Sequence, residues 1–219
     1  MQAPLIRALL AEVIGTFALI FAGCGAIMVD TKTHELGHVG VSFTFGLVIA
    51  AMIYAVGHVS GAHFNPAVTF AFALTRHFPW PRVFAYWGAQ LLGAVVAAAV
   101  LRASLGNVAS IGATLPSGSQ GQAFLFEVVL SAFLMFVVMA VATDTRAVGE
   151  AAAIAVGATI AFDALFGGPV TGASMNPIRS LGPAIVSTNF HAIWLYILAP
   201  IGGTSIGALA YQAVRGERR

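Results

Sequence analysis

The sequence predicts an all-α membrane protein with six transmembrane helices and two re-entrant half-helices, arranged as an inverted repeat of three spans plus three. Three observations predict it. The chain is 59% hydrophobic and only 8% charged, whereas soluble domains carry roughly 25% charged residues. Six apolar segments are long enough to cross a bilayer, and two shorter ones each begin at a proline. The two halves of the chain also repeat the same motifs at a nearly constant offset.

Composition excludes several classes of function. The net charge is only +2 and the basic residues are scattered, so we expect no nucleic-acid partner. No group of Cys, His or acidic residues has metal-ligand spacing, and there is no phosphate loop or catalytic triad. We therefore expect no metal, no cofactor and no enzymatic activity. The single cysteine, Cys24, lies in an apolar run and is expected to be a small buried hydrophobic residue rather than a reactive thiol.

A helix needs about 20 apolar residues to cross a hydrocarbon core of about 30 Å. Six segments meet this length: 6–29, 40–58, 82–102, 122–142, 150–168 and 191–213. The first contains Arg7, but the apolar run that follows it, Ala8 to Val29, carries Glu12 and is too long for the apolar region of a typical signal peptide. We therefore interpret the segment as a span.

Two shorter apolar segments, 66–75 and 177–186, each begin with a proline, which is favoured in the first turn of a helix. They are too short to span the bilayer. Irregular backbone at membrane depth is tolerated only where protein buries it or where it lines a wet cavity. We therefore expect two half-helices that enter from opposite faces and meet with their N-termini in the middle.

Corresponding residues recur in the two halves. Asn65 corresponds to Asn176, and Glu12 to Glu127. Because each half holds an odd number of spans, the second copy must enter the membrane inverted, and such repeats commonly place a site near the midplane. We expect one channel domain over 1–219, with the first repeat at 1–102, a connecting extracellular loop at 103–121 and the second repeat at 122–219.

Basic residues predict the orientation, because they are enriched in cytoplasmic loops. With both termini cytoplasmic, three basic residues lie outside or in the outer half: Lys32, Arg102 and Arg179. Seven lie inside: Arg7, Arg76, Arg82, Arg146, Arg215, Arg218 and Arg219. We therefore expect both termini in the cytoplasm, and a plasma membrane or bacterial inner membrane as the location.

The two Asn-Pro pairs suggest the chemistry of the site. An Asn side chain caps a helix through its oxygen, which leaves the two N–H groups of its amide free to bind a solute. Two helix N-termini, each with about half a positive charge, favour the lone pairs of a neutral solute and repel cations. The alternative for a single Asn-Pro pair is an ordinary surface turn.

The doubled motif, GHVSGAHFNPAVT and GPVTGASMNPIRSLGPA, resembles the major intrinsic protein family, the aquaporins and aquaglyceroporins. The phrases SGAHFNPAVTFAFA (60–73) and TDTRAVGE (143–150) resemble the nodulin-type branch and its bacterial relatives. The resemblance covers essentially the whole chain. It implies the aquaporin fold and a homotetramer in the lipid bilayer, whose independent pores passively conduct water or small neutral solutes.

The resemblance also implies roles for individual residues. The central motifs are Asn65, Pro66, Ala67, Asn176, Pro177 and Ile178. The selectivity filter is Phe45, Ala164, Ala173 and Arg179. Backbone carbonyls of Gly61, Ala62, His63, Phe64, Gly172, Ser174 and Met175 form a ladder of acceptors. Glu12 and Glu127 accept backbone N–H bonds from the re-entrant loops, the alternative being a proton relay.

The four filter residues are the basis of our hypothesis about which solutes pass. Strictly water-selective relatives have His at the second position, where this chain has Ala164, and Ala173 follows at the third. We expect a wider, less polar opening with Phe45 opposite Arg179, suited to glycerol-like molecules or to neutral boric or arsenous acid. Ser180 departs from the Asp of classical glycerol channels. The alternatives are a strict water channel, a secondary transporter, and a structural membrane protein with little conductance.

Three further residues carry expectations. Ile178 replaces the usual Ala, which predicts a slightly displaced or more apolar midpoint. His63 is interpreted as bonded within its loop, with a pH gate as the alternative. Asp163 is interpreted as hydrogen-bonded to a loop or helix, with a position in the vestibule near Arg179 as the alternative.

Overall fold

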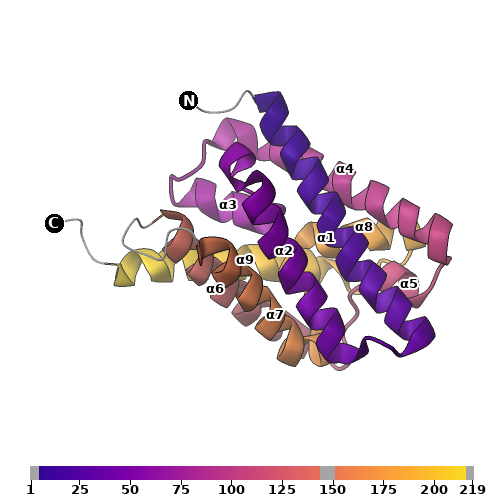
Figure 1. The fold of residues 1–219 in the computed structure, drawn as a ribbon. Coiled ribbons are helices and arrows are strands. Elements are labelled where there is room, and N and C mark those ends of the chain that lie inside the picture. The colour runs from indigo at the N-terminus through magenta and orange to yellow at the C-terminus, as the bar shows by residue number, and fades with distance from the viewer. Residues whose placement is uncertain (1–4, 144–150, 216–219) are drawn as a thin grey trace.

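The computed structural model describes residues 5–143 and 151–215, and all of the elements in them are helices (Figure 1). Six are long enough and apolar enough to cross a membrane: α1 (Leu5–Thr33), α2 (Gly37–Ser60), α4 (Trp80–Leu105), α6 (Gln120–Thr143), α7 (Ala152–Thr171) and α9 (Ile193–Val214). Two short helices, α3 (Pro66–Leu74) and α8 (Pro177–Ser187), begin at the predicted prolines. The predicted fold class is confirmed.

The helix ends differ from the predicted spans by a few residues. The predicted start of the fifth span, residue 150, lies outside the described residues. At its other end α7 continues through Pro169 to Thr171, beyond the predicted end. Pro169 has no N–H to offer the carbonyl of Leu165 one turn earlier, and His38 Nε2 lies 2.7 Å from that oxygen. Because a carbonyl only accepts, His38 must carry its proton on Nε2. This bond keeps the helix intact past the proline.

Close helix contacts at glycines hold each half together. A Cβ on Gly93 would lie 2.4 Å from the Val13 carbonyl oxygen, so α4 packs directly on the backbone of α1. In the second half a Cβ on Gly203 would lie 2.2 Å from the Val128 oxygen, where α9 meets α6. These small residues therefore serve contacts within the chain, as backbone-to-backbone packing in membranes requires.

A third glycine contact joins the two halves. Helices α2 and α7 cross where a Cβ on Gly46 would lie 2.4 Å from the Gly157 oxygen, and a Cβ on Gly157 would lie 2.5 Å from the Gly46 oxygen. The two glycines have the same offset in sequence as Asn65 and Asn176. The crossing point is therefore formed by equivalent positions of the two repeats.

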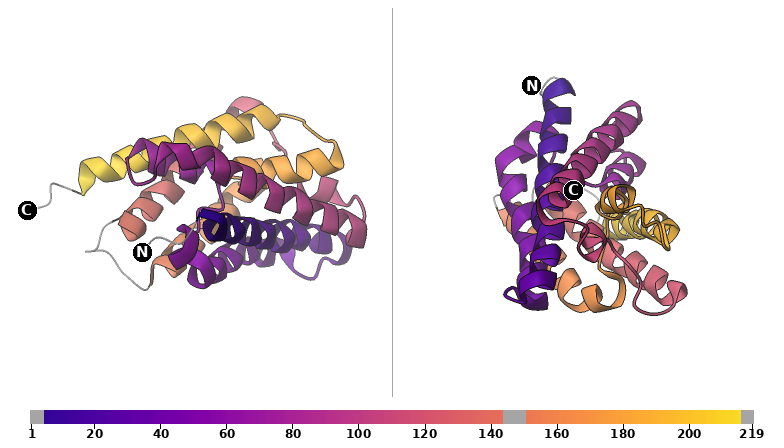
Figure 2. Two further views of the ribbon diagram at one scale, coloured as in Figure 1. Left: turned by 90° about the horizontal axis from the view of Figure 1, so that it is seen from above. Right: turned by 90° about the vertical axis from the view of Figure 1, so that its right-hand side faces the viewer.

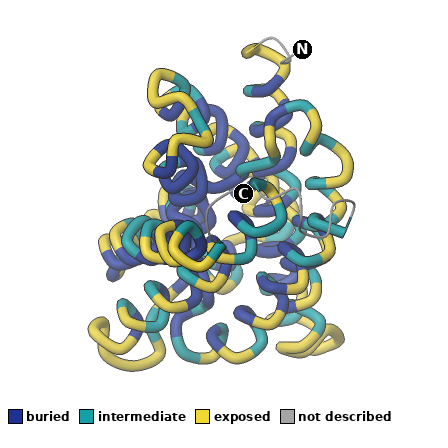
Figure 3. Tube along the Cα trace, turned by 90° about the vertical axis from the view of Figure 1, so that its left-hand side faces the viewer, coloured by how far each residue is buried: buried dark blue, intermediate teal, exposed yellow. Residues whose placement is uncertain are grey.

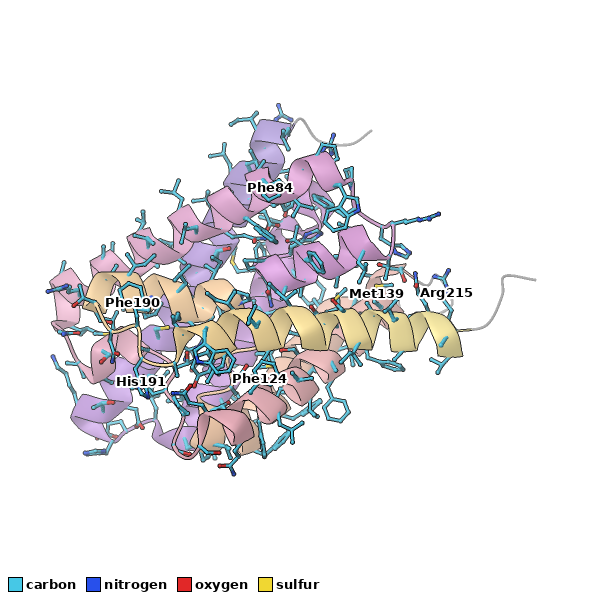
Figure 4. All side chains as sticks on the ribbon, turned by 180° about the vertical axis from the view of Figure 1, so that it is seen from behind. Phe84, Phe124, Met139, Phe190, His191 and Arg215 are labelled. Atoms are coloured by element: carbon cyan, nitrogen blue, oxygen red, sulfur yellow. The ribbon has the colours of Figure 1, made fainter. Side chains whose placement is uncertain are left out.

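The half-helices lie among the long helices, with α3 and α8 toward opposite ends of the molecule (Figure 1). In the right-hand view of Figure 2, α1 and α2 lie toward one side and α9 toward the other. Exposed positions follow the outward faces of the long helices, while buried positions face inward (Figure 3). Large apolar side chains are among the exposed ones. Phe84, on α4 at the back of the molecule (Figure 4), is 74% exposed. Such outer faces suit a lipid environment.

Candidate functional site

The two re-entrant loops have the same backbone shape. Gly61 and Gly172 end α2 and α7 with φ of 86° and 82°. Positive φ then recurs at Ala62 and Phe64 in the first loop, and at Ala173 and Met175 in the second. L residues adopt this conformation only where their surroundings impose it. The loops are therefore held from outside, and the holding groups are buried acids.

Glu12 holds the first loop from α1. Its Oε1 accepts from the backbone N–H of His63 (2.9 Å) and from Ser60 Oγ (2.7 Å). Its Oε2 accepts from the N–H of Phe64 (2.7 Å) and from Gln90 Nε2 (2.8 Å). The carboxylate is fully buried and every one of these donors is a polar group that lipid could not satisfy.

Glu127 holds the second loop from α6 in the same way. Its Oε1 accepts from the N–H of Ser174 (2.8 Å) and from Thr171 Oγ1 (2.7 Å), and its Oε2 accepts from the N–H of Met175 (2.8 Å). The position equivalent to Gln90 is Pro200 in this half, so the fourth donor is replaced by an apolar ring. The two halves are thus similar in geometry but unequal in bonding.

Two tyrosines complete the loops. Tyr86 donates its hydroxyl to the Ser60 carbonyl (2.9 Å), and Tyr196 donates to the Thr171 carbonyl (2.7 Å). Tyr86 and Tyr196 are 110 residues apart, close to the offset of 111 between the two asparagines. Each tyrosine satisfies a carbonyl at the end of a helix, where the last turn leaves acceptors without intrahelical donors.

The asparagines cap the half-helices and also bond across the midplane. Asn65 Oδ1 accepts from the N–H of Ala67 (2.9 Å), and Asn176 Oδ1 accepts from that of Ile178 (3.0 Å). Asn65 Nδ2 donates to the Met175 carbonyl (2.8 Å), and Asn176 Nδ2 donates to the Phe64 carbonyl (2.9 Å). The expectation that both N–H groups of each amide are free is therefore wrong. One of the two is used by the opposite loop, and only one remains for a solute.

Two cavities adjoin these loops. An inner cavity of about 110 Å³ is lined by both asparagines and by six of the seven predicted carbonyl residues, Gly61, Ala62, His63, Phe64, Ser174 and Met175. An outer cavity of about 330 Å³ is lined by the seventh, Gly172, and by Asp30 and His38. The linings of the two cavities share four residues only: Phe45, Ala164, Ala173 and Arg179. These are the four predicted filter residues, and they lie where one cavity meets the other.

The four shared residues have a definite geometry. The Arg179 guanidinium carbon lies 4.9 Å from the centroid of the Phe45 ring, and Arg179 Nη1 donates to the Gly112 carbonyl (2.7 Å). The guanidinium therefore lies over the face of the Phe45 ring, in a cation–π arrangement. A Cβ on Gly23 would lie 2.1 Å from the Phe45 ring, so that glycine makes room for it.

The family model described as Major intrinsic protein matches residues 1–211. The chain belongs to the major intrinsic protein family. It is 50% identical to "Aquaporin NIP1-1" of Oryza sativa subsp. japonica, over 97% of this chain and 75% of that protein. It is also 50% identical to "Nodulin-26" of Glycine max, over 97% and 79%. The resemblance to the nodulin-type branch is confirmed.

A solved structure agrees with this assignment. The aquaglyceroporin from Plasmodium falciparum has a TM-score of 0.85 and 25% sequence identity, with 97% of each chain covered. The chain is therefore a multi-pass membrane channel of the major intrinsic protein family, and it is not an enzyme.

Not all residues of the central motifs reach the cavities of this family member. Pro66, Ala67, Pro177 and Ile178 are buried and line neither cavity. Ile178 instead belongs to the hydrophobic core. Its side chain adds no apolar surface to the lumen, contrary to the sequence-based expectation, because the capped first turn of α8 points it into the protein.

Replacing Ile178 by Ala should therefore reduce stability and leave the pore intact. Burial of this side chain predicts a loss of about 2 to 5 kcal/mol, and Ile178→Val about 0.5 to 1.5 kcal/mol. Thermal unfolding in detergent measures the first effect, and water permeability per folded channel the second. A changed permeability with unchanged thermal stability would show that the side chain does face the lumen.

Asp163 differs from both expectations. It is fully buried in α7, and neither carboxylate oxygen has a hydrogen-bond partner within the described residues. It lines neither of the two cavities, so it is not in the vestibule. The sequence shows an acid within an apolar span, but the absence of a hydrogen-bond partner could not be predicted from it.

His63 is bonded to the half-helix α3 that follows its loop. Its Nδ1 lies 3.0 Å from Thr69 Oγ1, and its ring packs 4.9 Å from Phe72, 4.8 Å from Phe78 and 5.2 Å from Tyr86, measured between ring centroids. These contacts agree with the structural interpretation of His63. They also place its ring in an aromatic cluster beside the inner cavity.

Proposed function

We propose that this chain is a passive channel for water and for small uncharged solutes, chiefly glycerol-like polyols and neutral hydroxides such as boric or arsenous acid. The observation that carries the proposal is the junction between the two cavities. Every solute that passes from the outer to the inner cavity meets Phe45, Ala164, Ala173 and Arg179. The chemistry of these four side chains therefore decides what enters.

Their chemistry suits a compact solute with an apolar side. Ala164 and Ala173 contribute only methyl groups, which neither narrow the opening nor offer hydrogen bonds. Arg179 offers N–H donors, and the Phe45 ring beside it offers an apolar surface. A polyol or a trihydroxide can accept hydrogen bonds from the guanidinium through its hydroxyl oxygens and place its carbon or metalloid side on the ring.

Cations and protons are excluded by positive charge on the pathway. Arg179 carries a full charge, and the N-termini of α3 and α8 each add about half a charge where their capping asparagines line the inner cavity. A neutral solute is not repelled. Glu12 and Glu127 line neither cavity, so neither offers the coupling-ion site that a secondary transporter requires.

The assembly and placement of the channel belong to the same proposal. We place both termini in the cytoplasm and the chain in a plasma or bacterial inner membrane as a homotetramer, with repeats at 1–102 and 122–219 joined by the outer loop 103–121. Large apolar side chains exposed on the outer faces of the long helices support burial against lipid or other copies. Three of the residues used for the orientation lie outside the described residues: Arg146, Arg218 and Arg219. Most of the stretch TDTRAVGE (143–150), which resembles the nodulin-type branch, also lies outside them.

Stopped-flow measurements on proteoliposomes test the proposal. We expect the channel to accelerate fluxes of water, glycerol and boric acid over empty liposomes, and to leave sorbitol flux unchanged. Fluxes should follow the solute gradient alone. Water flux without glycerol or boric acid flux would make the chain a strict water channel, and a dependence on an imposed ion gradient would make it a transporter.

Replacing Ala164 by His should narrow the junction toward water. We expect glycerol permeability to fall at least roughly tenfold, which corresponds to about 1.4 kcal/mol of added barrier, while water permeability is largely kept. Ala164→Val is the matched control for volume, because it adds bulk without hydrogen-bonding groups. Glycerol permeability that is unchanged in both variants would show that Ala164 is not at the constriction.

A further inference from the structure

The Arg179 guanidinium is held by neutral groups that lie outside the two cavities. Arg179 Nη1 donates to the Gly112 carbonyl at 2.7 Å, and it lies 3.6 Å from Cys24 Sγ. Arg179 itself is only 2% exposed. Cys24 comes from α1 and Gly112 from the segment between the two repeats, and neither residue lines either of the two cavities. The position of the filter cation thus depends on elements that a solute does not touch.

The segment that carries Gly112 has an unusual backbone. Four consecutive residues, Ala109, Ser110, Ile111 and Gly112, have φ of 46°, 49°, 59° and 66°. They form α5 (Ala109–Gly112), which is therefore a left-handed turn. Successive L residues adopt this hand only where the surroundings determine it fully.

Hydrogen bonds on both sides of the turn provide these surroundings. We call residues 109–117 the strap. Ser110 Oγ accepts from Asn189 Nδ2 (3.3 Å), and Thr114 Oγ1 donates to Ser180 Oγ (2.6 Å). Ser117 donates to the Val170 carbonyl through its N–H (3.1 Å) and its hydroxyl (3.0 Å). Ile111 is fully buried. The strap is thus fastened to the end of α7, to α8 and to the residues after α8.

Glycine is required where the strap meets α1. A Cβ on Gly112 would lie 2.9 Å from the Cα, Cβ and carbonyl oxygen of Cys24, in addition to the strain of its positive φ. The missing side chain lets the strap sit directly on α1, and this contact brings the Gly112 carbonyl within reach of Arg179. The Cys24 thiol, which is fully buried, fills the remaining space and acts as a weak acceptor.

From these contacts we infer that Gly112 and Cys24 are positioning residues of the filter, which fix the Arg179 guanidinium and thereby determine the solute selectivity of the channel. The inference rests on the proposed function. With Nη1 held by Gly112 and Cys24, the remaining N–H groups of the guanidinium keep one direction relative to Phe45. Without its acceptor the side chain extends into the junction, which obstructs glycerol more than water.

The test is Gly112→Ala, with Gly106→Ala as the matched control. Gly106 lies just before the strap and also has positive φ (+82°), but a Cβ there meets nothing within 4 Å. In proteoliposomes we expect Gly112→Ala to lower the ratio of glycerol to water permeability by roughly fivefold or more, as expected for loss of a hydrogen bond to a charged group. Gly106→Ala should keep the wild-type ratio. Equal ratios in the two variants would overturn the inference.

Substitutions of Cys24 provide a second test, which can be carried out even if the Gly112→Ala variant does not fold. Cys24→Ser keeps an acceptor of nearly the same size, and Cys24→Ala removes it. We expect the ratio of glycerol to water permeability to be kept by Ser and lowered by Ala, and a ratio that is the same in both variants would contradict the role of the thiol. Should the wild-type channel pass water alone, the solute part of the proposed function fails. Water permeability per folded channel then becomes the readout. It should fall in Gly112→Ala and Cys24→Ala, and should be kept in Gly106→Ala and Cys24→Ser.

Discussion

Glu127→Gln is expected to yield a channel that unfolds at a much lower temperature and carries little water or solute. Both carboxylate oxygens of Glu127 accept bonds, from the N–H groups of Ser174 and Met175 and from the Thr171 hydroxyl. A glutamine amide must turn its NH2 toward one of these donors. Each buried donor left without an acceptor costs about 1 to 3 kcal/mol, so we expect a loss of roughly 2 to 5 kcal/mol in the free energy of unfolding.

Thermal unfolding and size-exclusion profiles of detergent-solubilised protein measure this effect, and stopped-flow gives the flux per folded channel. Glu35→Gln is the control, because it is the same change at an exposed acid. Glu12→Gln should be more damaging than Glu127→Gln, since Gln90 gives Glu12 a fourth donor. A Glu127→Gln protein as stable as the wild type would mean that another group supports the second loop.

Arg179→Ala is expected to open the channel to ions and to larger polyols. A unit charge about 5 Å from a passing cation contributes on the order of 3 kcal/mol at an effective dielectric constant of about 20. Its removal should therefore raise proton or cation leakage by at least roughly tenfold. The lost side-chain volume should also admit sorbitol, which we expect the wild-type junction to exclude.

Arg179→Lys separates charge from shape. Lysine keeps the positive charge but cannot reproduce the planar fork of N–H donors, so the ion barrier should persist while the ratio of glycerol to water permeability changes. A pH-sensitive dye enclosed in liposomes reports the leakage, and stopped-flow light scattering reports the solutes. If the Arg179→Ala channel leaks no more protons than the wild type, the barrier to protons is due to the helix N-termini alone.

The sequence predicted the elements well, because each depends on local composition. Long apolar runs predicted the six spans, and Pro66 and Pro177 predicted where the half-helices begin. The repeat related Asn65 to Asn176. The resemblance to the family, carried over by position relative to these two residues, implied all four side chains shared by the cavities. These features are set by order along the chain, which a sequence displays directly.

Features set by distances between remote segments could not be predicted. The bonds from each asparagine to the opposite loop depend on how closely the loops approach, and so does the contact of Arg179 with Gly112, 67 residues earlier. The left-handed turn of the strap has no motif. Two signals were present but were not used. Gly46 and Gly157 share the offset of the asparagines, and the replacement of Gln90 by Pro200 in the second repeat marks the unequal bonding of the two acids.

The reciprocal bonds between the loops have a consequence for biosynthesis. The Asn65 side chain donates to the carbonyl of Met175, which is synthesised 110 residues later. The Asn176 side chain donates to the carbonyl of Phe64. Neither loop can complete its hydrogen bonds while the other is missing. A chain emerging from the ribosome therefore has no finished passage through the bilayer until its last part is inserted. We expect the conducting path to form in a single late step of insertion. Partly synthesised chains would then not make the membrane leaky.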